Sequence, residues 1–100
     1  MNNVLLTLVM PDELAQEMKD LLLSRPDLIK GFTASHAEGR GATVELVEAG
    51  ELVDGYALRT VIRSVGSETA MREIIALIKQ ELPRAHTYFW LVPIIDMGSL

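Results

Sequence analysis

Two short runs near the ends of the chain are apolar on both of their alternating sides. Residues 4–10 read Val-Leu-Leu-Thr-Leu-Val-Met, and residues 87–95 read Thr-Tyr-Phe-Trp-Leu-Val-Pro-Ile-Ile. Successive side chains of a β-strand point to opposite faces, so a strand of this composition needs a cover on each face. Pro93 cannot donate a hydrogen bond to a neighbouring strand, which places that part of the second run at a sheet edge or a bulge. Any fold of this chain must therefore shield two strands from both sides.

Two other segments have the spacing of amphipathic helices. Pro11, Asp12 and Glu13 suit a first helical turn, where proline is tolerated and acidic side chains are favoured by the helix dipole. One buried stripe follows at positions i, i+4, i+7 and i+8: Leu14, Met18, Leu21 and Leu22. Ser67 is the best N-cap for a second helix, which Pro83 ends. The apolar face of that second helix comprises Met71, Ile74, Ile75, Ile78 and Leu82.

The middle of the chain indicates two strands, residues 31–36 and 56–63, with a long polar connection between them. The connection contains four glycines (Gly39, Gly41, Gly50 and Gly55), and residues 43–48 alternate partly, as in a short strand or flap. A hairpin needs only about two to five loop residues, and a connection this long in a compact domain is usually functional or mobile. We therefore expect residues 38–55 to form a long loop that faces a partner protein.

The order strand, helix, strand, strand, helix, strand predicts an α+β, ferredoxin-like βαββαβ fold. Residues 1–100 would form one domain, with two helices on one face of a four-stranded antiparallel sheet. The chain is 49% apolar, which is enough for a packed core. A net charge of −5 without a Lys/Arg cluster argues against nucleic acid as a partner. No apolar run approaches the roughly 20 residues of a membrane helix, and no basic leader precedes the first run, so we expect a cytoplasmic protein without membrane insertion.

Two helices cover only one face of such a sheet, and the other face would still be apolar. One side of the first run carries Val4, Leu6, Leu8 and Met10, and the other carries Leu5 and Val9. In the last run, Phe89, Leu91 and Ile95 oppose Tyr88, Trp90, Val92 and Ile94. Burying the side chains left over is worth on the order of 10 kcal/mol per subunit, against about 4–15 kcal/mol lost on association. We predict a homo-oligomer whose outer sheet faces meet; the alternative is a monomer whose long loop folds over the sheet.

Two residues are candidates for a divalent-metal site. His36 and Glu38 would project from one face of a strand and, with His86 or Glu45 alongside, would supply nitrogen and oxygen ligands. The alternative is a solvated polar pair. The chain has no cysteine, which excludes thiolate metal sites and cysteine nucleophiles. It also has no serine–histidine–aspartate set, Walker loop or zinc-protease motif, so we expect no enzymatic activity.

Three arginines, Arg40, Arg59 and Arg63, are candidates for binding a small anion at a cleft between subunits. Arginine suits this task because its planar guanidinium group binds carboxylate and phosphate with two parallel hydrogen bonds. Even spacing places Arg59 and Arg63 on the same strand face. The alternative is that the arginines are solvated or that they pair with acidic residues of the hairpin: Glu45, Glu48 and Asp54.

Short motifs over nearly the whole chain form a recognisable set. They are residues 6–11 (Leu-Thr-Leu-Val-Met-Pro), residues 31–33 with Ser35, the glycines around Arg40, residues 53–55 running into Arg59, residues 88–93, and residues 98–100. Together they resemble the bacterial family called domain of unknown function 3240, which is considered PII-like. The resemblance implies a ferredoxin-like trimer with sheets inward and long loops beside the clefts between subunits. Members are often encoded beside heavy-metal efflux pumps, which implies a metal-response or efflux-accessory role and an efflux pump or another protein as partner.

The chain departs from true PII signal proteins just before its last strand. Those proteins bind ATP through a glycine-rich basic turn, whereas residues 82–86 here read Leu-Pro-Arg-Ala-His. A backbone phosphate nest usually needs glycine, so this departure argues against ATP binding of the usual PII kind. The favoured interpretation is a PII-like sensor or adaptor that binds a small ligand at intersubunit clefts. Two alternatives are a metal-binding tolerance protein similar to the CutA group, with His36 and Glu38 as ligands, and a ligand-free structural interaction module.

Overall fold

The computed structural model describes residues 2–41 and 57–100. The elements follow the predicted order: β1 (Asn3–Pro11), η1 (Asp12–Leu14), α1 (Ala15–Leu23), β2 (Thr33–Gly39), β3 (Ala57–Ser67), α3 (Glu68–Glu81) and β4 (Tyr88–Pro93). The strands form one antiparallel sheet in the order β2-β3-β1-β4. The predicted ferredoxin-like α+β fold is therefore confirmed. The strand expected at residues 43–48 and the glycines Gly50 and Gly55 lie outside the described residues.

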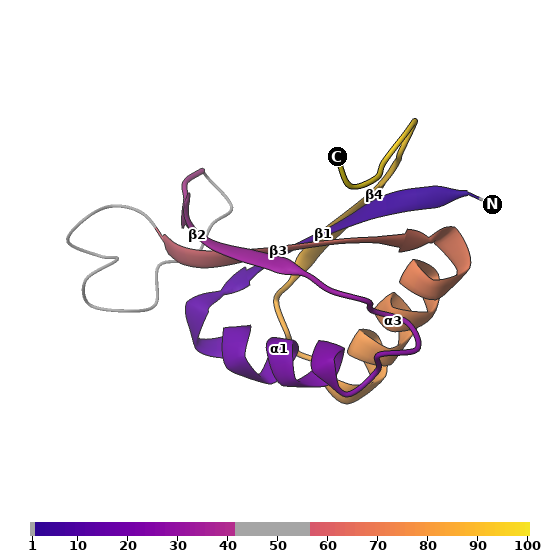
Figure 1. The fold of residues 1–100 in the computed structure, drawn as a ribbon. Coiled ribbons are helices and arrows are strands. Elements are labelled where there is room, and N and C mark those ends of the chain that lie inside the picture. Colours follow the sequence, from indigo (N-terminus) through magenta and orange to yellow (C-terminus); the bar gives the residue numbers. More distant parts are fainter. Residues whose placement is uncertain (1, 42–56) are drawn as a thin grey trace.

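The helices lie on one side of the sheet, and the last residues of the chain lie on the other side (Figure 1). β1 is hydrogen-bonded on both edges, to β3 and to β4. β4 is an edge strand, and Pro93 at its end stands opposite Val4 of β1. This is the edge position predicted for Pro93, where a missing N–H group does little harm. No helix within the described ranges is long and apolar enough to cross a membrane.

The core fills the space between the helices and the facing side of the sheet. β1 and β3 contribute Val4, Leu6, Leu8, Met10 and Ile62. The helices contribute the predicted apolar stripes, with Met18 and Leu22 from α1 and Met71, Ile74, Ile75 and Ile78 from α3. Ser67 caps α3 as predicted, because its Oγ accepts a hydrogen bond from the Ala70 N–H at 3.1 Å. The structure thus assigns the even-numbered side of β1 to the core.

Several predicted element boundaries are wrong. β2 begins at Thr33 instead of residue 31, because the Gly31 carbonyl accepts a hydrogen bond from Ser64 Oγ at 2.6 Å and does not enter the strand ladder. β2 then continues to residue 39. β3 continues to Ser67 because it stays paired with the start of β1. Ile95 was expected on the last strand, but β4 ends at Pro93 and Ile95 is fully exposed.

The face of the sheet away from the helices is largely apolar, and it is open along β4, whereas Thr7 and Val61 at its centre are buried. It carries odd-numbered residues of β1 and β3 and the even-numbered residues of β4, including Leu5, Val9, Val61, Val65, Tyr88, Trp90 and Val92. Tyr88 remains 62% exposed and Trp90 49% exposed. We call this surface the outer face. It is the uncovered apolar surface that the alternation in the first and last strands predicts.

Candidate functional site

An open hollow of about 910 Å³ lies at one end of the sheet, beside the connection from α3 to β4. It exists because the strands have unequal lengths at this end. β4 pairs with β1 only as far as Tyr88 opposite Val9, whereas β3 stays paired with β1 up to Pro11. The space beside Pro11 is bounded by the last turns of α3, by residues 82, 83 and 85–87, and by the end of β2.

Three cationic side chains line this hollow, those of Arg40, Arg59 and Lys79, together with the imidazole of His86. Two carboxylates, those of Glu13 and Glu38, lie among them. Glu38 is already engaged, since its Oε2 lies 3.1 Å from Arg40 Nη2 and 3.2 Å from Arg40 Nε. Lys79 Nζ lies 5.7 Å from the centre of the Phe89 ring, in cation–π contact. The lining therefore favours an anionic ligand over a cationic one.

Arg59 reaches the hollow by lying against the end of β2. A Cβ atom added to Gly39 would lie only 3.1 Å from Arg59 Cγ, which is a tight contact. Arg59 Nη1 donates a hydrogen bond to the Leu58 carbonyl at 3.2 Å. A glycine at position 39 thus lets the aliphatic part of Arg59 pack against the neighbouring strand.

His86 contributes an unusual backbone conformation to the wall of the hollow. Its φ is 46°, in the left-handed region that glycine adopts without strain. The turn around it is tied together locally: the Ala85 N–H donates to the Leu82 carbonyl at 3.1 Å, and Thr87 Oγ1 donates to the Ala85 carbonyl at 3.0 Å. Sparsely populated backbone conformations cost about 1–3 kcal/mol each and cluster at ligand sites.

The structure brings two of the three predicted arginines, Arg40 and Arg59, to the hollow, and Arg63 does not line it. Arg59 and Arg63 share the outer side of β3, but they are four positions apart along the strand, a distance of about 13 Å. Arg40 pairs with Glu38, and the acidic partners expected from the hairpin lie outside the described residues. Lys79 was not predicted for an anion site, because helical spacing shows only that it lies off the apolar stripe of α3.

The predicted metal pair, His36 and Glu38, is two residues apart on one side of β2, but each side chain has its own partner. Glu38 is held by the ion pair described above, whereas His36 Nδ1 lies 3.8 Å from Asp12 Oδ2. Thr60 Oγ1 donates to Asp12 Oδ1 at 2.8 Å and so orients that carboxylate. Within residues 2–41 and 57–100, no three His, Asp or Glu side chains come together as a metal site. Glu45 lies outside those ranges.

The sequence profile of one protein family matches the whole chain. That family is described as protein of unknown function (DUF3240), and the match covers residues 1–100. A search of curated proteins finds no match.

Several solved structures share the fold at low sequence identity. A DUF3240 family protein from Shewanella baltica is 14% identical, with a TM-score of 0.79 over 100% of this chain and 98% of that chain. CPII from Thiomonas intermedia, a nitrogen regulatory PII-like protein bound to ADP, AMP and bicarbonate, is 12% identical, with a TM-score of 0.72 over 100% and 98%. A putative PII-like signaling protein from Thermus thermophilus is 18% identical, with a TM-score of 0.66 over 94% and 88%. At these identities the likeness establishes a PII-like, ferredoxin-like fold.

Proposed function

We propose that this chain, which belongs to the DUF3240 family and has a PII-like fold, is a sensor or adaptor that binds a small anion. In this proposal three copies assemble through their outer faces, and each ligand lies in a cleft between subunits. Residues 38–55 face a partner protein. The protein acts in the cytoplasm and performs no catalysis. Its connection with heavy-metal efflux rests on the family resemblance alone.

One observation supports anion binding above the others, namely the basic lining of the hollow at the end of the sheet. Arg40 approaches it from just beyond the end of β2, Arg59 from β3 and Lys79 from α3. Residues 82–86 contain no glycine, so side chains must supply most of the hydrogen bonds that a backbone nest would otherwise donate. Guanidinium groups suit that task for a carboxylate, a carbonate or a phosphate group.

Isothermal titration calorimetry with bicarbonate, inorganic phosphate, AMP and ADP tests the proposal. Three of these compounds are ligands of the Thiomonas protein. We expect at least one to bind, and Arg59→Ala to weaken binding by about tenfold or more, because a hydrogen bond to a charged group is worth about 1.5–3 kcal/mol. Arg84→Ala is the matched control, since Arg84 belongs to the same end of the molecule but does not line the hollow. Binding of none of the four compounds, or equal losses in both variants, would contradict the proposal.

The exposed outer face supports assembly. Tyr88, Trp90 and Val92 are each more than two-fifths exposed, and large apolar patches on soluble proteins usually mark interaction sites. Sedimentation velocity over a range of concentrations should give the mass of three chains. A stable single chain at micromolar concentration would remove the intersubunit cleft from the proposal.

Ligand binding should also affect the segment that we propose to face the partner. We expect protease cleavage within residues 39–55 to slow when the bound anion is present, because the base of this segment, Gly39 and Arg40, lines the hollow. Cleavage far from the hollow, after Lys19 of α1, serves as the internal control. If no anion or divalent metal tested changes the rate of cleavage, the proposed effect of ligand binding on this segment is contradicted.

A second candidate function, divalent-metal binding, is supported by the approach of His36 to Asp12. Their ligand atoms are 3.8 Å apart, and Thr60 orients the carboxylate as an outer-shell partner commonly does. Calorimetry with zinc, copper, cobalt and nickel tests this function. Loss of binding in both His36→Ala and Asp12→Ala, with Glu38→Ala unchanged, would assign the metal to His36 and Asp12. Loss in His36→Ala and Glu38→Ala would assign it to the predicted pair, and an unchanged isotherm in His36→Ala would exclude both.

A further inference from the structure

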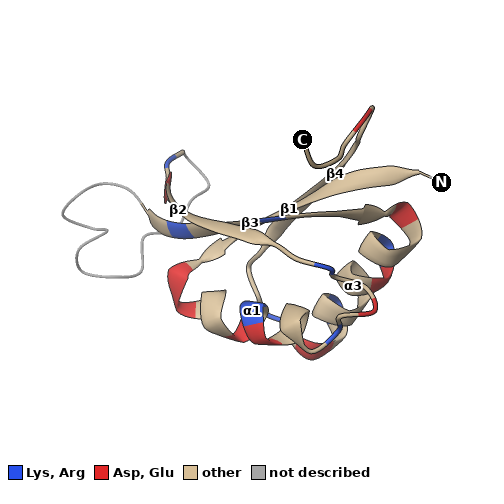
Figure 2. Ribbon diagram, viewed as in Figure 1, with Lys and Arg blue, Asp and Glu red and all other residues tan. Residues whose placement is uncertain are grey.

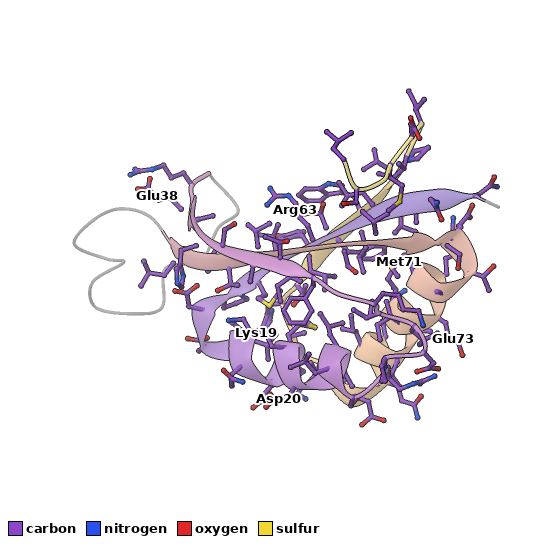
Figure 3. All side chains as sticks on the ribbon, in the orientation of Figure 1. Lys19, Asp20, Glu38, Arg63, Met71 and Glu73 are labelled. Atoms are coloured by element: carbon purple, nitrogen blue, oxygen red, sulfur yellow. The ribbon has the colours of Figure 1, made fainter. Side chains whose placement is uncertain are left out.

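The side chain of Arg63 lies on the outer face and forms no hydrogen bond or ion pair with any described residue. In the sheet register Arg63 stands opposite Thr7, and Thr7 stands opposite Trp90, so the three side chains form one row across β3, β1 and β4. Figure 3 shows Arg63 on the side of the sheet away from the helices. Its direct neighbours across the sheet are Thr7 and Thr33, and Val61 and Val65 flank it on the same side of β3.

The outer face contains no carboxylate among the described strand residues. Its charged side chains there are Arg59 and Arg63, and the remaining strand residues of this face are apolar or neutral. When such a face packs against another surface, Arg63 loses its contact with water. A buried charge without an opposite partner is strongly disfavoured. An interface formed by this face must therefore bring a carboxylate from the other side.

Residues 94–100, which follow β4, have the complementary composition, and we call them the tail. The N–H of Ile94 donates to the Asn3 carbonyl at 3.0 Å and anchors the start of the tail. Beyond that anchor, the apolar side chains of Ile95 and Met97 are exposed, and Asp96 lies between them. Figure 1 shows the tail on the side of the sheet opposite the helices. The tail thus offers a carboxylate within an apolar segment, on the side where the arginine lies.

Asp96 is the acidic residue of the described ranges that is best placed to meet Arg63. Most other carboxylates belong to the helices and to the turns beside them, as Figure 2 shows, and Glu38 is paired with Arg40. Asp96 Oδ1 accepts a hydrogen bond from the Met97 N–H at 2.9 Å. Asp96 Oδ2 has no partner among the described residues.

We propose that the tail of one copy lies across the outer face of a second copy and that Asp96 pairs there with Arg63. This inference rests on the proposed assembly and names the contact that specifies it. The tail does not occupy its own outer face, since Ile95 is fully exposed. In the assembly the apolar tail residues cover Trp90 and its neighbours. The Asp96 carboxylate neutralises the charge of Arg63, which has no acidic partner among the described residues of its own outer face.

Charge reversal tests the pair. Sedimentation equilibrium should show that Arg63→Glu and Asp96→Lys each weaken assembly by roughly 30-fold or more, as expected when one partner of a buried charge pair is lost. The double variant Arg63→Glu/Asp96→Lys restores an opposite pair and should recover at least about tenfold of that loss. Arg72→Glu and Asp20→Lys, which make the same charge changes on the exposed sides of the helices, should leave assembly unchanged. Circular dichroism checks that every variant is folded.

Cross-linking separates a contact between chains from one within a chain. The natural sequence has no cysteine, so an Arg63→Cys chain and a differently tagged Asp96→Cys chain can be mixed and oxidised without a background reaction. A mixed disulfide-linked dimer is the expected product. No mixed product, together with an internal disulfide in the Arg63→Cys/Asp96→Cys double variant, would overturn the proposal in favour of a tail folded on its own sheet.

The outcomes distinguish this inference from the function on which it rests. A wild-type protein that assembles, with a dissociation constant that neither charge reversal changes, would overturn the Asp96–Arg63 contact and leave the proposed assembly intact. A wild-type protein that stays a single chain would overturn both.

Discussion

The two sides of β1 are built from similar residues but have different environments. On β1, the helix-facing residues Val4, Leu6, Leu8 and Met10 are at most 6% exposed, whereas Leu5 and Val9 on the outer face are only half-buried. Leu5 and Leu6 are the same residue type and are adjacent in sequence, so composition does not cause the difference. The cause is the helix layer, which covers one face only. One side of a strand that is apolar on both sides thus belongs to the core of its own chain. The other side forms part of a surface that no other described element of the chain covers.

Truncating each of the two adjacent leucines is the most direct way to break this comparison. Leu6 is 1% exposed, so Leu6→Ala should lower the free energy of unfolding by about 2–5 kcal/mol through lost burial and a residual cavity. Leu5→Ala should cost much less in the folding of the dilute chain and should weaken assembly instead. Urea denaturation at low protein concentration measures the first effect, and sedimentation measures the second. Equal losses of folding stability would show that the single chain already packs both faces alike.

Two glycines, Gly66 of β3 beside the core and Gly98 of the tail, allow the next comparison. A Cβ atom on Gly66 would lie 2.7 Å from Cε of the fully buried Met71, whereas nothing lies within 4 Å of the same position on Gly98. Gly66→Ala should therefore lower the free energy of unfolding by about 1–3 kcal/mol, because a filled core resists an added methyl group. Gly98→Ala should change it by less than about 0.5 kcal/mol. The double variant Gly66→Ala/Met71→Leu lacks the terminal methyl group of Met71, so it should recover part of the lost free energy of unfolding. No recovery would show that the clash with Met71 does not cause the loss.

The left-handed backbone of His86, in the wall of the hollow, allows a test of local strain. His86→Gly should raise the free energy of unfolding by up to about 1 kcal/mol, because glycine relieves the cost of a left-handed backbone but gains freedom in the unfolded chain. His86→Ala keeps the Cβ atom and should bring no such gain. Urea denaturation of both variants measures the difference. A glycine variant no more stable than the alanine variant would mean that this turn holds no strain.

The smallest effect concerns an ion pair on the surface of the helix layer. Arg25 donates hydrogen bonds of 3.0 and 2.8 Å to Asp27, and they lower the pKa of the Asp27 carboxyl below its ordinary value of 3.8. A carboxyl with a lowered pKa stabilises the folded state above its ordinary value, and this contribution is lost as the pH falls through the lowered value. In thermal denaturation, the Arg25→Ala variant should therefore unfold at a slightly lower temperature than the wild type at neutral pH. The difference between the two melting temperatures should vanish in strong acid. A difference that persists there would have to come from packing.

The order of elements was predictable because each element rests on local chemistry. The spacing of Met71, Ile74, Ile75 and Ile78 requires a helix buried along one side, and Ser67 is a hydrogen-bond acceptor at its start. The covered face of β1 was not predictable, since both sides of that strand are apolar. Strand ends were also missed, because they depend on pairing across the sheet, such as that of Asn3 with Ser67.

The candidate site was predictable only in part, since its contacts join distant parts of the chain. Even spacing placed Arg59 and Arg63 on one side of β3. It carried no information about where β4 begins. Because β4 begins only at Tyr88, the hollow lies beside Arg59 and not beside Arg63. The partner of His36 was missed for the same reason. Asp12 approaches it from the start of the helical layer and is oriented by Thr60, which is 48 residues away in sequence.

The two edge strands have a consequence for how copies of this chain meet. β4 is short and ends in Pro93, and β2 carries His36 and Glu38 along its length. Proline and charged side chains at open edges discourage another chain from adding a strand. Neighbouring molecules are thus steered away from extending one another's hydrogen-bond ladders into fibrils and toward stacking, which ends once the apolar surfaces are used up.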